Sequence, residues 1–181
     1  VTGGAGFIGS NYVRRIIDGT LGGITRVTVL DKLTYAGTLT NLASLPKDSF
    51  EFIQGDICDR DLVNKLVSNC DSVVNFAAES HVDRSINSPR VFLDTGVIGV
   101  YNLLEYCRDN PNIRFLQVST DEVYGSVENF FSTEKDNLKP RSPYASSKAS
   151  ADLLVEAFRI THGLNTKITR ASNNYGTRQF P

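Results

Sequence analysis

The chain has 181 residues, of which 40% are hydrophobic and 22% are charged, and its formal net charge at pH 7 is −1. This length suits one domain, and the near-balance of charge gives no indication of a nucleic-acid partner or of an anionic membrane surface. No apolar run approaches the roughly 18 residues of a membrane span, and no signal peptide is recognisable. Three cysteines, Cys58, Cys70 and Cys107, suit neither a zinc site nor a redox pair. We therefore expect no metal and a reducing, cytoplasmic environment.

Segments with strand patterns and helix patterns alternate along the chain. Strands are expected to end at 1–2 and to occupy 26–30, 50–54, 72–76, 113–119 and 166–169. Helices are expected from the first glycine-rich turn to Ile17, near 42–45, and over 59–67, 91–107 and 144–162, with Gly163 in the left-handed position after the last. The segments 32–41, 77–89, 125–143 and 170–181 are predicted to be loops. This alternation predicts an α/β fold with a doubly wound parallel sheet, in which ligands bind beyond the carboxyl ends of the strands.

Three glycines, Gly3, Gly6 and Gly9, stand between the first strand and the first helix. Glycines permit a tight turn and let the backbone approach a pyrophosphate, whose charge the amino terminus of the helix favours. Asp31 follows at the end of the next strand, where a carboxylate suits the adenosine ribose hydroxyls of NAD and repels a 2′-phosphate. Lys32 beside it weakens this preference over NADP. The alternative is a structural turn with a solvated aspartate.

A second group of polar residues has the pattern of acid–base chemistry. Thr120, Asp121 and Glu122 emerge at the end of a strand, and Tyr144 and Lys148 are four residues apart on one face of a helix. A neighbouring ammonium favours phenolate, so we expect a lowered pKa for the tyrosine. Adjacent carboxyl groups push their titrations apart, so that one can act as an acid while the other acts as a base. The alternatives are a pair of turn-capping acids and a surface pair on an ordinary helix.

These residues belong to a series of motifs that spans the chain. In order they are TGGAGFIG at 2–9, DKLTYAG at 31–37, GDI at 55–57, AAESHVDRS at 77–85, STDEVYG at 119–125, YASSK at 144–148 and SNNYG at 172–176. The set resembles the extended short-chain dehydrogenase/reductase family, and most closely its branch that dehydrates dTDP-glucose. Two positions depart from that branch, with Gly96 in place of the usual Asn and Val100 in place of Thr. Glycine inside a helix costs about 1 kcal/mol relative to alanine, so local rigidity is in question there.

The resemblance implies a role for each matching residue. Thr120, Tyr144 and Lys148 would carry out oxidation, and Asp121 and Glu122 would carry out dehydration. NAD would be held by Gly3, Gly6, Phe7, Ile8, Gly9, Asp31, Lys32, Leu33, Thr34, Asp56, Ile57, Phe76, Ala77, Ala78, Glu79, Ser80, Thr95, Tyr144, Lys148 and Asn174. The sugar nucleotide would be bound by Ser80, Thr120 and Asn173. Taken alone, Asp56 is equally suited to capping a helix or turn.

The implied reaction converts a nucleotide-activated glucose to its 4-keto-6-deoxy sugar. Tyr144 would take the proton of the C4 hydroxyl while hydride passes to NAD. Glu122 would take the C5 proton, Asp121 would help the C6 hydroxyl leave, and hydride would return to C6. The alternative enzyme is a nucleotide-sugar epimerase or decarboxylase on the same scaffold, which needs no acid at position 121. A non-catalytic NAD-binding protein is the alternative from a different class.

The ends of the chain lead to a further expectation. The sequence begins at Val1 without Met and stops at Pro181 just past a predicted loop. We expect residues 1–181 to be the NAD-binding Rossmann domain of a longer protein, with most of the sugar-nucleotide-binding region beyond it. We also expect this piece alone to fold poorly, because its central strand keeps only its last residues.

Oligomeric state is predicted from the helix expected at 91–107. It carries apolar residues on most sides, which indicates that more than one of its faces is covered. In the family this helix and the one bearing Tyr144 pack across a two-fold axis, so a homodimer is expected. Cover by neighbouring helices of the same chain is the alternative.

Overall fold

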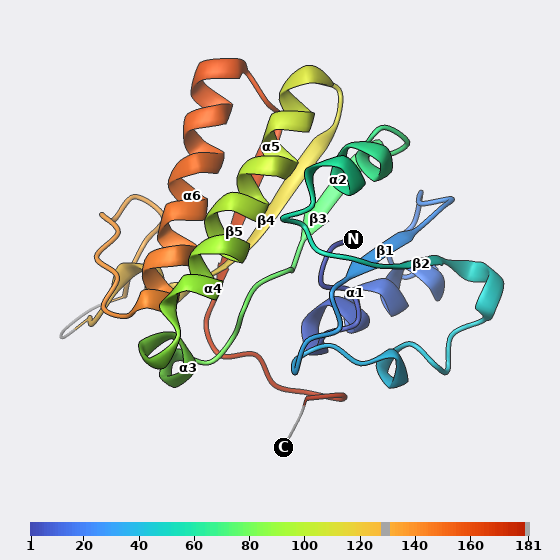
Figure 1. The fold of residues 1–181 in the computed structure, drawn as a ribbon, viewed down its shortest axis with the longest axis horizontal. Helices are drawn as coiled ribbons and strands as arrows, with labels where there is room; N and C mark the ends of the chain where they lie inside the picture. Colours follow the sequence, from blue (N-terminus) through green and yellow to red (C-terminus); the bar gives the residue numbers. More distant parts are fainter. Residues whose placement is uncertain (128–130, 180–181) are drawn as a thin grey trace.

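The computed structural model describes residues 1–127 and 131–179, so residues 128–130 and 180–181 of the predicted loops lie outside the described residues. Its strands run parallel (Figure 1). They are β1 (Thr28–Asp31), β2 (Glu51–Gln54), β3 (Ser72–Asn75), β4 (Arg114–Thr120) and β5 (Thr166–Ala171). β1 pairs with β2, and β4 lies between β3 and β5. Each strand falls where the sequence predicts one, with its ends shifted by one or two residues.

Thr2 joins the two groups of strands into one sheet. It pairs in parallel with Leu30 of β1 on one side and with Asn75 of β3 on the other. Its backbone nitrogen donates to the Val74 carbonyl at 3.0 Å, and the nitrogen of Gly3 donates to the Leu30 carbonyl at 2.8 Å. The order β2–β1–Thr2–β3–β4–β5 confirms the predicted doubly wound parallel sheet, with the first strand position at its centre.

A line of buried polar side chains crosses the middle of this sheet. The Thr2 hydroxyl donates to Asn75 Oδ1 at 2.5 Å, and Asn75 Nδ2 donates to Gln117 Oε1 at 2.8 Å. Asn75 is 0% exposed and Gln117 is 1% exposed. Because buried amides cost free energy unless they are paired, these bonds favour one register of the central strands.

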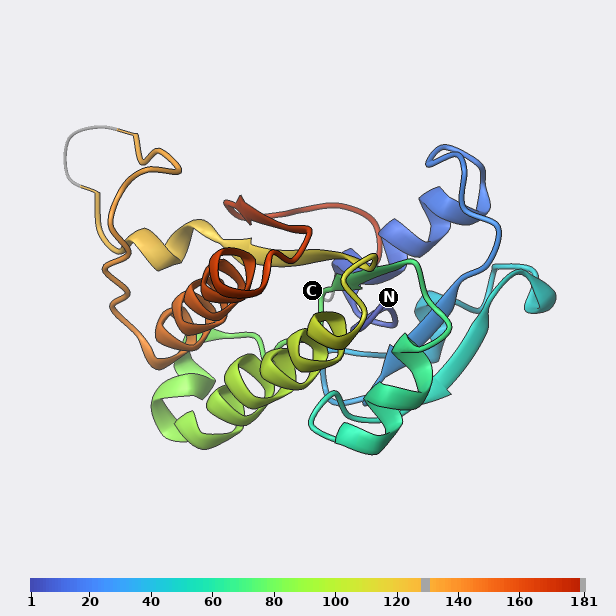
Figure 2. The same cartoon turned by 90° about the horizontal axis from the view of Figure 1, so that it is seen from above.

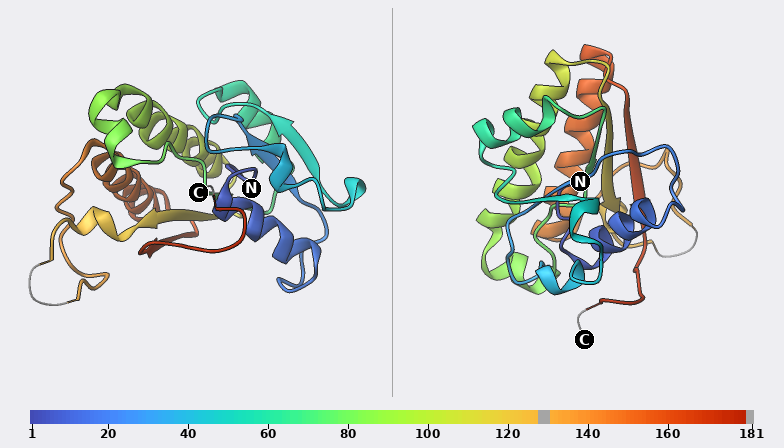
Figure 3. Two further views of the ribbon diagram at one scale, coloured as in Figure 1. Left: turned by 90° about the horizontal axis from the view of Figure 1, so that it is seen from below. Right: turned by 90° about the vertical axis from the view of Figure 1, so that its right-hand side faces the viewer.

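Helices lie on both faces of the sheet (Figures 2 and 3). α1 (Phe7–Ile17) covers one face beside β1 and β2, where Val13 and Ile16 pack with Val29. α2 (Arg60–Val67), α5 (Val100–Asp109) and α6 (Pro143–His162) cover the other face. Residues buried between these helices and the sheet include Val63, Val73, Leu103, Phe115 and Val155. The layers therefore leave the carboxyl ends of the strands at one edge, where the loops with the predicted site residues emerge.

The predicted helix at 144–162 is confirmed and is well defined at both ends. The Ser142 hydroxyl accepts from the Ala145 nitrogen at 3.0 Å, and Pro143 occupies the first turn. Gly163 ends α6 with a φ of +70°, the left-handed conformation that glycine adopts without strain. The first turn of α6, which carries Tyr144, is thereby held in a defined position.

The helix expected at 91–107 is longer than predicted and changes register in its middle. It comprises α4 (Pro89–Leu93), a π-helical segment η3 (Asp94–Gly99) and α5. A Cβ on Gly99 would lie 2.5 Å from the side chain of Ile57, and one on Gly96 would lie 3.1 Å from Ser147 of α6. Small residues in the wide turn therefore let this helix approach both neighbours closely, which a hydrophobic pattern alone does not reveal.

Two other predictions of secondary structure are wrong. No helix occupies 42–45; instead a 3₁₀ turn, η1 (Leu39–Asn41), comes earlier, because the Thr38 hydroxyl accepts from the Thr40 nitrogen at 3.3 Å and caps it. The predicted loop 77–89 contains a short helix, α3 (Val82–Asn87). Its polar composition concealed it, although the Ser85 hydroxyl bonds back to the Val82 carbonyl at 2.6 Å.

One result concerns membranes. Among residues 1–127 and 131–179, none of the helices combines the length and the apolar character that a membrane crossing requires.

We predict that Asn75→Ala destabilises the intact protein by about 1–3 kcal/mol, because it leaves the Thr2 hydroxyl and the Gln117 amide without a buried partner. Urea unfolding monitored by circular dichroism measures the change. Asn69→Ala, at an exposed position after α2, is the control and should change stability by less than about 0.5 kcal/mol. Equal midpoints for the two variants would show that the buried ladder contributes nothing.

Candidate active site

The turn before α1 requires its glycines for different reasons. Gly3 has a φ of +66°, and a Cβ there would lie 2.6 Å from the Ala77 nitrogen. Gly9 packs directly on the Gly3 carbonyl, which leaves no room for a side chain. Gly6 caps α1 with a φ of −75°, and its nearest neighbour would be 3.3 Å from a Cβ. Since no side chain of the described residues caps this helix end, its backbone N–H groups can receive an anion.

Asp31 is buried at the end of β1 and fixes the glycine turn to the sheet. Its Oδ2 accepts from the Ala5 nitrogen at 2.9 Å, and its Oδ1 accepts from the Leu33 nitrogen at 2.8 Å. A carboxylate has about four lone-pair sites, so two remain that can accept from hydroxyl groups of a ligand. The predicted ribose-binding position is therefore structurally competent.

Lys32 and Asp56 form an ion pair, with Nζ 2.6 Å from Oδ2. Asp56 Oδ1 also accepts from the Cys58 nitrogen at 2.9 Å, which is the turn-capping role that the sequence left open. The hydrogen bond to Asp56 raises the pKa of Lys32. Burial alone would raise the pKa of Asp56, but the hydrogen bonds from Lys32 and Cys58 and the lysine charge together outweigh it, and the net shift is downward. The lysine charge is thus neutralised beside Asp31.

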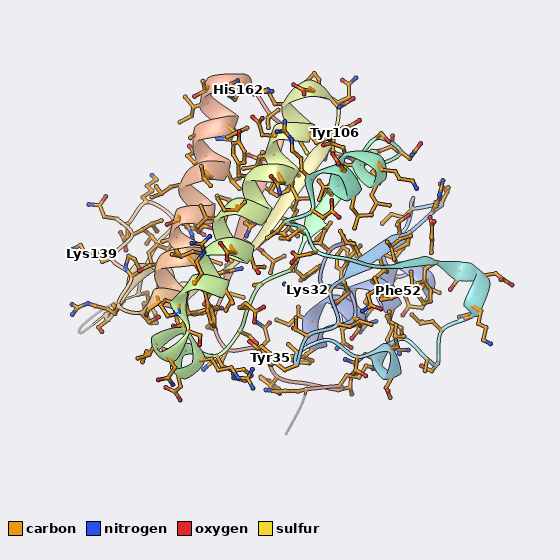
Figure 4. All side chains as sticks on the ribbon, viewed as in Figure 1. Lys32, Tyr35, Phe52, Tyr106, Lys139 and His162 are labelled. Atoms are coloured by element: carbon orange, nitrogen blue, oxygen red, sulfur yellow. The ribbon has the colours of Figure 1, made fainter. Side chains whose placement is uncertain are left out.

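Tyr35 ties together two loops that the sequence assigns to the cofactor. Its hydroxyl donates to the Ser80 carbonyl at 2.6 Å and accepts from the Ser80 nitrogen at 2.9 Å. The Arg84 guanidinium lies 3.8 Å from the centre of its ring. Figure 4 shows Lys32 and Tyr35 near the middle of the molecule, whereas His162 lies at the far end of α6. Sequence reasoning missed Tyr35, although it stands within the 31–37 motif.

A cavity of about 290 Å³ adjoins this contact. It is lined by Tyr35, Glu79, Arg84, Asn87, Ser88, Val91 and Phe92. The ring of Phe92 meets the ring of Tyr144 edge-on, with 6.4 Å between their centres. One wall of the cavity, Phe92, therefore also packs against the predicted base, which itself does not line the cavity.

Thr120, Asp121 and Glu122 gather where β4 ends. Thr120 caps a 3₁₀ turn, η4 (Asp121–Tyr124), because its hydroxyl accepts from the Glu122 nitrogen at 3.3 Å. The same hydroxyl donates to Asp121 Oδ1 at 3.2 Å. Burial and the charge of Asp121 raise the pKa of Glu122, which makes it a stronger base than an ordinary glutamate. The acids are exposed members of a turn near Tyr144, and Thr120, not either acid, caps this turn.

Tyr144 lies at the start of α6 beside this turn, but its pKa moves opposite to the prediction. Burial raises the pKa of the phenol, and the negative charge of Glu122 raises it further, while a hydrogen bond with Thr120 acts in the lowering direction. The expected lowering by Lys148 is absent because that ammonium is directed elsewhere. The phenol nevertheless lies close enough to the predicted threonine and acid pair for all three to act on its pKa.

Lys148 is 5% exposed, and its ammonium donates to the Val118 carbonyl of β4 at 2.6 Å. Burial lowers the pKa of this lysine to about 8, and the nearby charge of Asp152 opposes the shift. The lysine therefore holds α6 against β4, one helical turn from Tyr144 and on the same face.

The remaining predicted residues fall at the same edge with different degrees of support. Thr95 is buried in η3, and the ring of Phe76 packs on Tyr12 of α1, with 5.2 Å between centres. Ile57 belongs to the core, so only its backbone can face a ligand. Asn173 and Asn174 are exposed on the loop after β5. This loop returns to α1, where the Thr177 carbonyl accepts from Asn11 Nδ2 at 2.9 Å.

These features define a nucleotide-binding α/β domain with an acid–base site at the edge where its strands end. The chain matches the family described as GDP-mannose 4,6 dehydratase over residues 1–181, and it belongs to that family.

Individual relatives are similar over the whole chain. The chain is 53% identical to the low-salt glycan biosynthesis protein Agl12 of Haloferax volcanii and 50% identical to a dTDP-glucose 4,6-dehydratase of Streptomyces niveus, covering 100% of this chain and 58% and 55% of theirs. Among solved structures, DesIV, a dTDP-glucose 4,6-dehydratase of Streptomyces venezuelae with NAD and TDP bound, superposes with a TM-score of 0.96 at 47% identity. That match covers 99% of this chain and 57% of DesIV. The chain thus spans little more than half the length of these relatives.

We predict a pH-dependent stability contribution from Lys148. Between its folded pKa of about 8 and the ordinary value of 10.5, the unfolded state binds more protons, so stability rises with pH in this window. Relative to Lys148→Met, the unmodified protein should gain on the order of 3 kcal/mol from pH 8 to 10.5. Denaturant unfolding at several pH values measures it, with Lys65→Met on the surface of α2 as control. A difference between wild type and Lys148→Met that does not change with pH would contradict the shifted pKa.

Proposed function

We propose that the intact protein is an NAD-dependent dTDP-glucose 4,6-dehydratase, a hydro-lyase that forms the 4-keto-6-deoxy sugar nucleotide. The observation that supports this proposal is the proximity of Tyr144, at the start of α6, to the turn that bears Thr120, Asp121 and Glu122. The proposed oxidation base and the two proposed dehydration acids therefore lie near one another. The similarity to DesIV and to the dehydratase of Streptomyces niveus supports the same reaction.

The residues of the glycine turn fit a dinucleotide. Gly6 leaves open the amino end of α1, where Phe7 and Ile8 offer backbone N–H groups to a pyrophosphate. Asp31 suits the ribose hydroxyls, and the pairing of Lys32 with Asp56 leaves no bare ammonium beside it to attract a 2′-phosphate, which favours NAD over NADP. When bound, NAD supplies the acceptor for hydride from the sugar C4 and returns that hydride to C6.

Tyr144 removes the proton of the C4 hydroxyl, and Thr120 binds and positions the same oxygen. Because burial and Glu122 raise the pKa of the phenol, it needs nearby positive charge to act as a base near neutral pH. Because the Lys148 ammonium binds the Val118 carbonyl, the cationic nicotinamide of the oxidised cofactor would supply this charge. In this mechanism the pKa of Tyr144 is therefore low only when the oxidised cofactor is bound.

Glu122 and Asp121 complete the reaction. A keto group at C4 makes the C5 proton acidic, and Glu122, whose pKa is raised, accepts it. Asp121 donates a proton to the C6 hydroxyl, which leaves as water. Their place on consecutive residues of one short 3₁₀ turn suits the proposed action at adjacent carbons of one sugar.

We infer a homodimer from apolar side chains that face outward. They lie on α4, η3, α5 and α6, which run beside one another in Figure 1. They are Val91, Leu93, Ile98, Tyr101, Leu153 and Ile160, each at least 39% exposed. Packing this surface against a second copy of the chain would remove its apolar side chains from water. The free thiols of Cys58, Cys70 and Cys107 support a cytoplasmic location.

An epimerase or decarboxylase of the same scaffold is the second candidate, since it would use Tyr144 and Lys148 in the same way. Asp121 favours dehydration, because the other reactions expel no C6 hydroxyl. Mass spectrometry of the product decides between them: loss of water supports the dehydratase, and a product that keeps its C6 oxygen overturns it. A non-catalytic NAD-binding protein would form neither product.

We predict that Tyr144→Phe lowers the turnover of dTDP-glucose by about 10²–10⁴-fold, because it removes the general base while keeping the ring. Product formation is followed by chromatography. Tyr101→Phe, on the outer face of α5, is the matched control and should retain turnover. If Tyr144→Phe keeps normal turnover, the phenol is not the base.

We predict that Asp121→Asn separates oxidation from dehydration. Tyr144 and Thr120 remain, so the C4 hydroxyl is still oxidised, but the C6 hydroxyl lacks its acid. The absorbance of the reduced nicotinamide should therefore rise and persist on the enzyme, while the 4-keto-6-deoxy product falls by about 10²-fold or more. Rapid-mixing spectrophotometry measures both. Normal product formation without this signal would remove Asp121 from the mechanism.

A further inference from the structure

A buried ion pair lies behind the candidate site and has no role in the chemistry above. Arg170 of β5 donates from Nε to Asp152 Oδ2 on α6 at 2.7 Å, and the side chains are 18% and 1% exposed. Burial raises the pKa of Asp152, while the hydrogen bond from Arg170 and the charges of Arg170 and Lys148 oppose that shift. Because an isolated buried carboxylate is costly, the arginine is required wherever the aspartate is charged.

The same guanidinium also reaches the turn that carries the acids. Arg170 Nη1 donates to the hydroxyl of Tyr124 at 2.8 Å, and its Cζ lies 5.2 Å from the centre of that ring. Tyr124 is the last residue of η4, so its position is coupled to those of Asp121 and Glu122. One side chain from β5 therefore binds both α6 and η4.

The α6 end of this contact continues the face that carries the oxidation residues. Tyr144, Lys148 and Asp152 follow one another at intervals of four residues, so they lie along one side of the helix. Lys148 holds this face to β4 through the Val118 carbonyl. Arg170 ties its next position to η4. A planar guanidinium suits this task because it can bind two partners in fixed directions.

We propose that Arg170 is a positioning residue that, through Asp152 and Tyr124, sets the acid pair of η4 relative to the phenol on α6. This inference rests on the proposed function. The arginine touches neither Asp121 nor Glu122 and acts through the turn that holds them. Its loss should therefore impair dehydration more than oxidation, since Tyr144 and Thr120 are fixed by α6 and by β4.

Two gentle variants of the intact protein test this inference. Tyr124→Phe removes only the hydroxyl that Arg170 binds. Arg170→Lys keeps the positive charge facing Asp152 but loses the planar guanidinium that binds two partners at once. Arg170→Ala would leave the aspartate unpaired and is avoided for that reason. The matched controls are Tyr106→Phe on α5 and Arg159→Lys, whose guanidinium pairs with Glu156 on the surface of α6. Thermal unfolding establishes that each variant is folded.

The readout is the reduced nicotinamide on the enzyme during a single turnover of dTDP-glucose. In both test variants we expect its formation rate to stay within about twofold of wild type and its decay to slow about tenfold, the loss expected for one hydrogen bond to a charged group. The double variant should slow decay no more than the worse single variant, because both changes break one link. The controls should match wild type.

Three outcomes are informative in the other direction. Equal slowing of formation and decay would mean that Arg170 only supports the general structure, and decay at the wild-type rate would mean that it positions nothing; either result overturns the inference. Additive slowing of decay in the double variant would mean that the two substitutions act independently, which would overturn the proposed connection through Arg170 and Tyr124. Failure of the proposed function is separate, because wild type would then show neither the nicotinamide signal nor the 4-keto-6-deoxy product.

Discussion

The pairing of Thr2 with both β1 and β3 is the contact on which the site depends. The residues suited to the cofactor come from the glycine turn and β1, whereas the acid–base residues come from β4 and α6. Within the described sheet, the central strand position joins these two groups. A shift of one residue in a strand reverses the directions of all its side chains. The buried hydrogen bonds from Thr2 through Asn75 to Gln117 oppose such a shift, because any other register would leave amide groups unpaired in the core.

Buried charged residues of α6 are the second feature that positions the site. Lys148 and Asp152 are both almost fully buried. Lys148 binds the Val118 carbonyl of β4, and Asp152 binds Arg170 of β5 through Oδ2, while its Oδ1 has no partner among the described residues. Such contacts add little net stability compared with apolar packing, but they are directional. They therefore orient a helix that apolar side chains alone would hold less precisely. Tyr144, at the start of that helix, inherits its position from them.

Much of the arrangement could be predicted from local patterns. The glycine turn, the Gly163 cap and the acids after β4 have signals that depend on a few neighbouring residues. The π-helical segment was missed because it depends on how closely Gly99 approaches Ile57, which is a contact distant in sequence. The lowered pKa expected for Tyr144 was wrong for a similar reason: spacing showed that Lys148 shares its face, but not that its ammonium binds the sheet. The sequence pattern predicts a loop at Arg170, although β5 continues through this residue.

The raised pKa of Tyr144 has a consequence for the order of events. A phenol that is buried beside an acid keeps its proton until a cation arrives, so under the proposed mechanism the base becomes active only when the oxidised cofactor is seated. An empty or spent site would then leave the sugar untouched. Such an inactive resting state needs no moving lid, because the same burial that holds the Tyr144 ring in place also keeps its hydroxyl protonated.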